Sequence, residues 1–228
     1  MERQHFEAAL QALKSRLLSM AALVEERVHR AIRGLIERRA ELAQGVAAGD
    51  EEVNELQIEI DDRCLKLLAL QNPMAGDLRL ITAAMKINAD LERIGDQAVN
   101  IAEHALKLIC LPVLKPLIDI PRMADMAECM TRDSLDAFVR KDALLARNVL
   151  ARDDEVDELK DQLFRELLTY MMADPGTIER ALALILVSRS LERIADHATN
   201  IAEDTIFIVE AKDVRHHHEE TPPAGSSA

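Results

Sequence analysis

The chain has 228 residues, of which 49% are hydrophobic and only 2% aromatic, and it contains 7 glycines and 7 prolines. This composition is typical of long helices packed through aliphatic side chains and disfavours a sheet protein, which needs more aromatic, β-branched and turn residues. A formal net charge of -13 without a basic run argues against a nucleic-acid binder and favours cations or basic protein surfaces as partners.

The helical period of apolar residues organises the first half of the chain. It predicts an amphipathic helix from near the start to about Gln44, followed by a turn over Gly45 to Gly49. Asp50 is placed to cap a second helix, which Asn72-Pro73 ends. A third helix is expected from about Gly76 to Ile109.

Three prolines between Leu111 and Pro121 interrupt this pattern and predict a joint between two halves. The pattern then restarts, and helices are expected over about 121–148, 153–172 and 175–213. We therefore predict an all-α fold of two tandem antiparallel three-helix bundles related by internal duplication. The predicted divisions are a first repeat at 1–110, a proline-containing linker at 111–121, a second repeat at 122–214 and a disordered tail at 215–228.

One 13-residue segment occurs twice. Leu91 to Glu103 reads LERIGDQAVNIAE and Leu191 to Glu203 reads LERIADHATNIAE, so the copies differ only at 95/195, 97/197 and 99/199. On a helix the shared Leu, Ile and Ala residues form an apolar stripe, whereas the shared Glu, Asp, Asn and Glu lie roughly opposite. A second correspondence relates the residues around Asp50 to those around Asp153, which are 103 residues apart, whereas the copies of the 13-residue segment are 100 residues apart. A three-residue length change therefore lies between the two corresponding regions.

The repeated acids form carboxylate pairs one helical turn apart, and like charges at that spacing repel. Arg93 and Arg193 could offset the repulsion through ordinary surface ion pairs, and a cation held by oxygen ligands from two helices could do so as well. The all-oxygen donors suit Mg, Mn, Ca or ferric iron. The candidate metal ligands are Glu92, Asp96, Asp153, Asp157, Glu192 and Asp196, and the rest of the stripe supplies candidate partner-binding residues, namely Asn100, Glu103, Asn200 and Glu203.

The sequence offers no arrangement typical of catalysis. It lacks a nucleophile motif and a glycine-rich phosphate loop, so no catalytic residue and no organic cofactor are predicted. Glu26 and His29 match the Glu-x-x-His step of di-iron bundles but are expected to face water. Three widely spaced cysteines, the lack of a leader and the lack of a long apolar run predict a cytoplasmic protein that reaches membranes only through partners.

Four segments together resemble the PhoU family of phosphate-transport regulators. They are LLALQNPMAGDLR at 67–79, MKINADLERIGD at 85–96, SLERIADHATNIAED at 190–204 and IFIVEAKDVRH at 206–216. The resemblance implies a cytoplasmic, non-enzymatic negative regulator of the phosphate-starvation response, built as two three-helix bundles. It also implies an adaptor between the ATPase subunit of a high-affinity phosphate ABC transporter and a phosphate sensor histidine kinase, and a homodimer.

Some members of that family bind iron or other metal clusters through paired Glu/Asp-x-x-x-Asp motifs, which Glu92 with Asp96 and Glu192 with Asp196 match. The first half departs from the pattern, because Asn54 stands where Asp157 stands in the second half. A weaker metal site in the first half is therefore expected. Two alternatives stay open: a metal-dependent helical-bundle enzyme that uses the same carboxylates, and a helical adaptor without metal.

Overall fold

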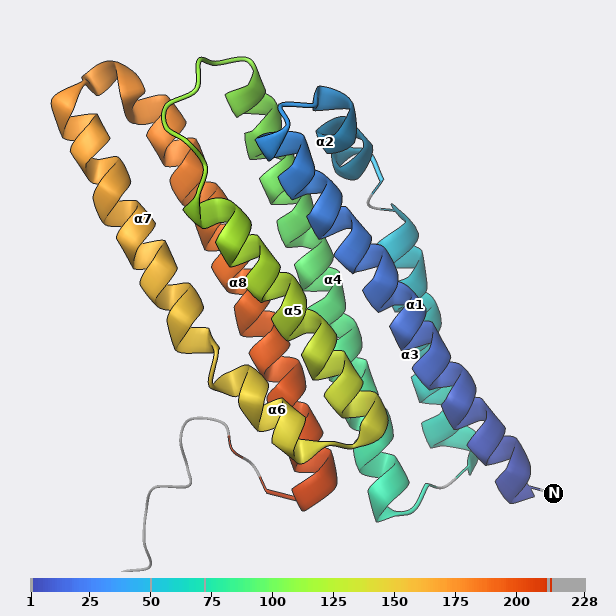
Figure 1. The fold of residues 1–228 in the computed structure, drawn as a ribbon. Coiled ribbons are helices and arrows are strands. Elements are labelled where there is room, and N and C mark those ends of the chain that lie inside the picture. The colour runs from blue at the N-terminus through green and yellow to red at the C-terminus, as the bar shows by residue number, and fades with distance from the viewer. Residues whose placement is uncertain (1, 50, 72, 213, 215–228) are drawn as a thin grey trace, which may run out of the picture.

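The computed structural model describes residues 2–49, 51–71, 73–212 and 214, and these residues are mainly helical, with no strand among them. Each half contributes three long helices and one short helix (Figure 1), which confirms the predicted all-α duplicated fold. The first half contains α1 (Glu2–Ile36), α2 (Ala40–Ala47), α3 (Glu51–Gln71) and α4 (Ala75–Ile109). The second contains α5 (Asp119–Arg140), α6 (Ala143–Leu150), α7 (Asp153–Ala173), the 3-10 helix η1 (Pro175–Thr177) and α8 (Ile178–Glu210).

Two of the predicted helices are broken in the structure. The helix expected to reach Gln44 ends at Ile36, and the helix expected over 121–148 is divided into α5 and α6. The breaks fall at Arg38 and Lys141, 103 residues apart, whose φ angles of 55° and 56° are left-handed and incompatible with a continuing helix. The apolar period hides these breaks, because α2 and α6 fold back and bury their own apolar residues against the same core.

The apolar stripe of the repeated segment lies in the core of each half, as predicted. In α4 and α8 its Leu, Ile and Ala side chains are at most 1% exposed: Leu91, Ile94, Ala98 and Ile101, and their counterparts Leu191, Ile194, Ala198 and Ile201. Each such Leu or Ile contributes roughly 1.5–3 kcal/mol of burial free energy. This burial fixes the rotation of both helices, so the opposite, acidic stripe is directed outward.

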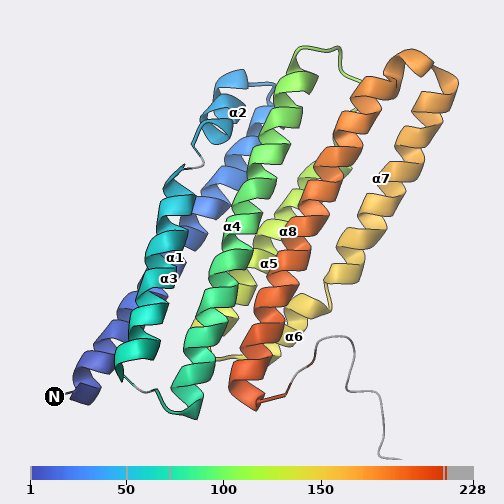
Figure 2. The same cartoon turned by 180° about the vertical axis from the view of Figure 1, so that it is seen from behind.

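The two halves pack through α4 and α8, which run antiparallel side by side at the centre of the molecule (Figure 2). Helix α3 flanks α4 on one side and α7 flanks α8 on the other, while α1 and α5 cover the opposite face (Figures 1 and 2). We call the line of contact between the two central helices the α4–α8 seam. Because both copies of the repeated segment border this seam, their outer residues share one face of the protein.

The connection between the halves is anchored on both sides. Arg38 donates to the carbonyl oxygens of Ile109 and Leu111, at 2.6 and 2.7 Å. Lys115 is buried and forms ion pairs with Asp119 and with Glu166 of α7. Of the three prolines that predicted a joint, the last lies in the first turn of α5, where a missing N–H costs little. The predicted boundaries at 111 and 121 stay predictions.

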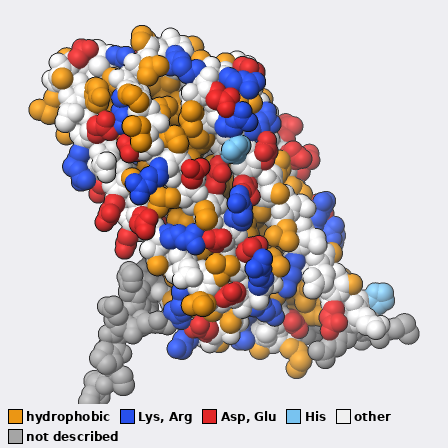
Figure 3. Space-filling model, in the orientation of Figure 1, with side chains coloured by type: hydrophobic (Ala, Val, Ile, Leu, Met, Phe, Trp, Pro, Cys, Tyr) orange, Lys and Arg blue, Asp and Glu red, His pale blue; other side chains and the backbone are white. Residues whose placement is uncertain are grey.

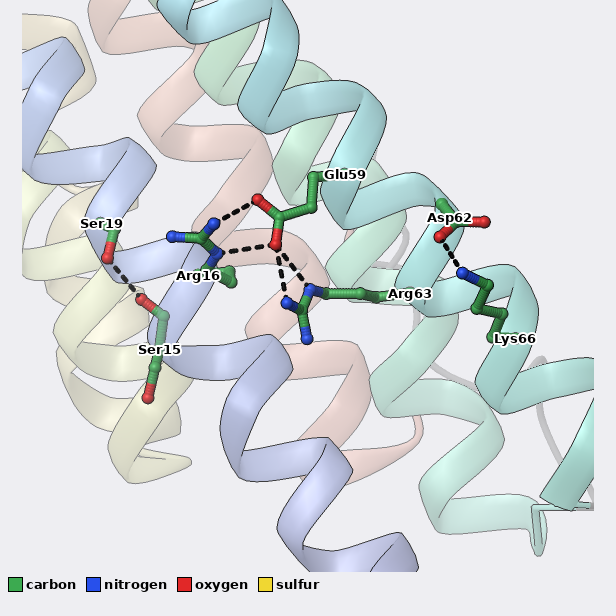
Figure 4. A network of polar contacts seen from close by, with 7 residues as sticks. All are labelled: Ser15, Arg16, Ser19, Glu59, Asp62, Arg63 and Lys66. Carbon is green, nitrogen blue, oxygen red and sulfur yellow. Dashed lines mark hydrogen bonds and ion pairs between the residues drawn. The ribbon is translucent and has the colours of Figure 1, made fainter.

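Ion pairs join helices at the surface. Figure 4 shows Arg16 of α1 and Arg63 of α3 converging on the carboxylate of Glu59, with Arg16 Nε 2.9 Å from Glu59 Oε1. Exposed pairs of this kind contribute little to stability. Acidic and basic side chains alternate over the face of Figure 3, and hydrophobic side chains gather near the end where α7 and the α4–α5 connection lie. No helix among the described residues is long and apolar enough to span a membrane.

Two predictions fall on residues that the structure does not describe. Asp50, the predicted cap of the second helix, and the tail at 215–228 lie outside the described residues. The predicted three-residue length change lies at the start of the last long helix of each half. Helices α3 and α7 both have 21 residues, whereas α4 begins 16 residues before Leu91 and α8 begins 13 residues before Leu191. Glu26 and His29 are exposed, as predicted, and His29 Nδ1 lies 3.6 Å from Glu128 of α5.

Candidate functional site

The acids of the second repeat come together where α7 packs against α8. Asp153 and Asp157 project from α7, and Glu192 and Asp196 from α8. Burial, and then the nearby carboxylates of Asp196, Asp157 and others, raise the pKa of Asp153 to about 6. Burial and the carboxylates of Glu192 and Asp157 also raise the pKa of Asp196. The four carboxylates therefore form one acidic cluster, which we call the second acidic face.

A lysine supplies a positive charge within this cluster. Lys160 Nζ donates to Asp157 Oδ1 at 2.7 Å and to Glu192 Oε1 at 3.0 Å, so it links α7 to α8. These two hydrogen bonds raise the pKa of Lys160 against the opposing effect of its partial burial. The second acidic face thus holds four carboxylates and one ammonium group. The position of Lys160 one turn after Asp157 is visible in the sequence, but its contact with Glu192 of another helix is not.

The first repeat differs at two linked positions. With the offset of 103, Asn54 corresponds to Asp157 and Gln57 corresponds to Lys160, so one negative and one positive charge are absent together. On α4, Glu92 is half-buried and Asp96 is exposed. We call the surface formed by Glu92 and Asp96 with the neighbouring part of α3 the first acidic face. The counterpart of Asp153 is Asp50, which lies outside the described residues.

The residues suit a hard cation in their chemistry but are not arranged around one. Carboxylate oxygens are the ligands that Mg²⁺, Mn²⁺ and Ca²⁺ prefer. Burial and, after it, repulsion between carboxylates raise the pKa of Asp153 and of Asp196, and a bound cation would relieve that repulsion. Among the described residues, however, no three His, Cys, Asp or Glu side chains are grouped so as to hold a metal ion. Lys160 pairs with two of these carboxylates, Asp157 and Glu192, so both would be available to a metal ion only if the lysine side chain moved away.

The remaining residues of the stripe lie closer to the α4–α8 seam. Asn100 Nδ2 lies 3.4 Å from Gln97 Oε1, and Asn200 Nδ2 donates to Asp90 Oδ1 at 3.3 Å. Glu103 is exposed, and Glu203 lines a hollow at the seam. Of the predicted partner-binding residues, Asn200 and Glu203 therefore lie at the seam between the halves, whereas Asn100 contacts its own helix and Glu103 is exposed.

Asp90 is the centre of a polar network across the seam that sequence analysis did not identify. Its side chain is 9% exposed and accepts from Asn200 of α8. His197 Nδ1 lies 3.0 Å from the same oxygen, Asp90 Oδ1, and Arg93 Nη1 lies 3.9 Å from it. Through this contact with Asp90, His197 of α8 joins the other half of the molecule. Only the antiparallel packing of α4 and α8 brings residues 107 positions apart together.

The acidic residues form open faces. Asp96, Asp157 and Asp196 are exposed, whereas catalytic carboxylates usually lie in a protected concave pocket. A separate hollow of about 200 Å³ lies at the connection between the halves and is lined mainly by apolar residues, among them Leu35, Leu108 and Leu117. None of the candidate metal ligands lines it. This geometry favours a binding surface over a catalytic site.

Taken together, the fold and site define a duplicated all-helical protein that presents two related acidic surfaces. A model of the family described as the PhoU domain matches the chain twice, at residues 17–105 and 120–205. The chain belongs to the PhoU family.

Named relatives and solved structures agree with this assignment. The chain is 45% identical to the "phosphate-specific transport system accessory protein PhoU homolog" of Pseudomonas putida, over 93% of this chain and 84% of that protein. It is also 45% identical to the homologue from Aquifex aeolicus (strain VF5), over 92% and 95% of the two chains. The relatives' names describe accessory proteins and no enzyme.

The fold is similar to two crystal structures. PhoU from Pseudomonas aeruginosa matches with a TM-score of 0.88 and 41% identity, over 91% of this chain and all of that one. The "phosphate transport system regulatory protein PhoU" from Streptococcus pneumoniae matches with a TM-score of 0.84 and 28% identity, over 92% and 99% of the chains.

Proposed function

We propose that this protein is a cytoplasmic negative regulator of the phosphate-starvation response, acting as a non-enzymatic adaptor. In this role one acidic face docks on the ATPase subunit of a phosphate ABC transporter and the other on a phosphate sensor histidine kinase. The names of its relatives, a transport accessory protein and a transport regulatory protein, support the proposal. Homodimerisation is part of the proposal through the family resemblance alone.

The observation that carries the proposal is the position of the two acidic faces. Glu92 with Asp96 and Glu192 with Asp196 project from the two central helices, which lie side by side on one face of the molecule. A scaffold with two related surfaces can hold two partners at once, which raises the effective concentration of one partner near the other. Carboxylate-rich surfaces select basic partner surfaces and speed their association.

Metal binding is a second part of the proposal. Glu92 and Asp96 would hold a cation on the first acidic face, and the four carboxylates around Lys160 would hold one on the second. Such an ion would neutralise the clustered carboxylates and change the charge that each face presents to a partner. The role of the protein side chains is to supply oxygen ligands, and in the second half to exchange the Lys160 ammonium for the ion.

The test is a binding assay with the purified kinase and ATPase subunit, one at a time and then together. E92A/D96A removes the first face and E192A/D196A the second, and the metal content of each preparation is measured in parallel. We expect each double variant to lose at least tenfold in affinity for one partner and to retain the other. Because the wild type engages both, it should form a ternary complex that neither variant forms.

The matched control is D125A/D136A, which removes two carboxylates from α5, on the opposite face of the molecule. It should bind both partners as the wild type does, because it changes the net charge equally but leaves both acidic faces intact. Wild-type affinity of both double variants for both partners would refute the adaptor proposal. If the double variants lose metal but still bind both partners, the acidic faces bind metal and do not bind the partners.

A further inference from the structure

A hollow of about 440 Å³ opens on the α4–α8 seam between the two acidic faces. Helix α4 contributes Arg93 and Gln97 to its lining, and α8 contributes Arg193, Asp196, His197, Thr199 and Asn200. The two arginines occupy equivalent positions in the repeated segment, so the near-symmetrical packing of α4 against α8 brings both residues to the lining of one hollow. Neither residue reaches the hollow without the other half of the molecule.

The hollow brings two arginines together in an acidic protein, with Asp90 beside its lining. Its lining holds two guanidinium groups and one carboxylate, Asp196, in a chain with a formal net charge of -13. Arg193 is exposed and forms no ion pair with another described residue, whereas Arg93 has a long contact of 3.9 Å with Asp90. Guanidinium groups present planar, paired N–H donors that match the oxygens of phosphate and carboxylate groups.

Neutral polar side chains complete the lining, and Asp90 holds two of them. Asp90 Oδ1 accepts from Asn200 and lies 3.0 Å from His197 Nδ1, so both side chains are fixed at the seam. With Nδ1 engaged by Asp90, Nε2 is the His197 ring nitrogen left to meet a ligand. Gln97 and Thr199 add further hydrogen-bonding groups. An arginine pair with several fixed polar groups has the chemistry of an oxyanion site.

The two copies of the repeated segment differ mainly at this hollow. Of the three differing pairs of positions, the pair 97/197 contributes both Gln97 and His197 to the lining, and the pair 99/199 contributes Thr199. The third pair, Gly95 and Ala195, is buried in the core. The two copies are related by an approximate two-fold axis, so the lining is asymmetric only where their residues differ. An asymmetric lining of this kind suits an asymmetric ligand.

We propose that this hollow binds a phosphate group, either as inorganic phosphate or as the terminal group of a small phosphomonoester. Arg93 and Arg193 pair with its oxygens, and Gln97, His197 and Asn200 hydrogen-bond to it. The volume exceeds what a lone phosphate needs and leaves space for a small ester group. The site shares Asp196 with the second acidic face but requires no metal and no protein partner. Its failure in the test below would therefore leave the adaptor proposal untouched.

The test is isothermal titration calorimetry on the full chain in EDTA, with inorganic phosphate in one arm and glycerol 3-phosphate in the other. We expect saturable binding with one ligand per chain. R93Q/R193Q should weaken it at least tenfold, and R193Q alone should weaken it several-fold. Because Arg193 is exposed and has no described ion-pair partner, R193Q is expected to fold normally, which thermal unfolding by circular dichroism checks.

The matched control is R165Q/R189Q, which removes two exposed arginines of α7 and α8 that do not line the hollow. It should keep wild-type affinity within about twofold, because binding at a specific site depends on hydrogen-bond donors at fixed positions. Non-specific electrostatic attraction would instead depend on the net charge, which both double variants change equally. The absence of saturable binding in both arms would overturn the proposal, and so would an equal loss in the control. Tighter binding of the free ion or of the ester identifies which source of phosphate the hollow accepts.

Discussion

Lys160 of α7 donates a 3.0 Å hydrogen bond to Glu192 of α8, which places an ammonium group inside the second acidic face. The first repeat has Gln57 at the corresponding position and Asn54 in place of Asp157, so the two acidic faces differ in charge distribution more than in net charge. The expectation of a weaker metal site in the first half considered only the missing carboxylate. The lysine acts in the opposite direction, because a cation entering the second face must displace it.

This arrangement predicts that K160Q tightens Mn²⁺ binding to the second face about 5- to 20-fold, since removing a nearby unit charge at a partly exposed site is worth on the order of 1–2 kcal/mol. Calorimetric titration measures the change. K66Q is the control, because Lys66 forms an exposed ion pair with Asp62 on α3, away from the second face. Unchanged or weaker Mn²⁺ binding in K160Q would show that the lysine does not compete with metal.

Asp153 predicts a pH-dependent stability. Burial and neighbouring carboxylates raise its pKa in the folded protein to about 6, against an unfolded value of about 3.9. The folded state therefore holds this proton more tightly, and the contribution to stability present below about pH 4 is lost as the pH rises through about 6. In EDTA, D153N should raise the melting temperature at pH 7.5 and lose this advantage near pH 4.

Calorimetric melting curves at the two pH values decide the matter, with D154N as the control. Asp154 is exposed and adjoins Asp153, so its substitution changes the net charge equally. An advantage of D153N that is equal at both pH values would contradict the electrostatic explanation.

Gly95 predicts a stabilising substitution. A Cβ atom at this position would meet Val53 Cγ1 at 3.4 Å, an ordinary van der Waals contact, and the second repeat already has Ala195 there. Since glycine within a helix costs roughly 0.5–1 kcal/mol relative to alanine, G95A should raise the free energy of unfolding by about that amount. Urea denaturation measures it.

G34A is the contrasting variant. Its Cβ would lie 3.1 Å from the backbone nitrogen of Ala43, where α2 folds back on α1, so we expect a loss of about 1–3 kcal/mol. Equal effects of G34A and G95A would mean that helix propensity outweighs the close approach between α1 and α2.

The Asp90 network predicts that the contact between the halves is sensitive to a single buried carboxylate. D90A removes the acceptor of Asn200, which is exposed and can bond to water instead, and the partner of His197, whose side chain is 16% exposed. Leaving one largely buried polar group unpaired costs roughly 1–3 kcal/mol. Urea denaturation should show a loss of about 1–3 kcal/mol. S190A alters the corresponding buried position of α8 without removing a charge, so its loss should be much smaller.

The sequence by itself determined the helical class, the duplication and the orientation of the central helices. The physical reason is that all three depend on local spacing: apolar residues three and four positions apart define the buried side, and the acids opposite them are then directed outward. Leu91, Ile94, Leu191 and Ile194 are buried as this pattern requires. The same reasoning placed α3, α4 and α7 to within a residue or two of their observed bounds.

Only the tertiary structure decided which distant residues meet. Apolar periodicity continues through Arg38 and Lys141, so it could not show that the chain reverses there. Lys160 with Glu192, Asp90 with His197, and Arg93 with Arg193 come from different helices, and no spacing within one helix relates them. These pairs depend on the antiparallel packing of α4 with α8 and on the packing of α7 against α8, which is set by the whole core.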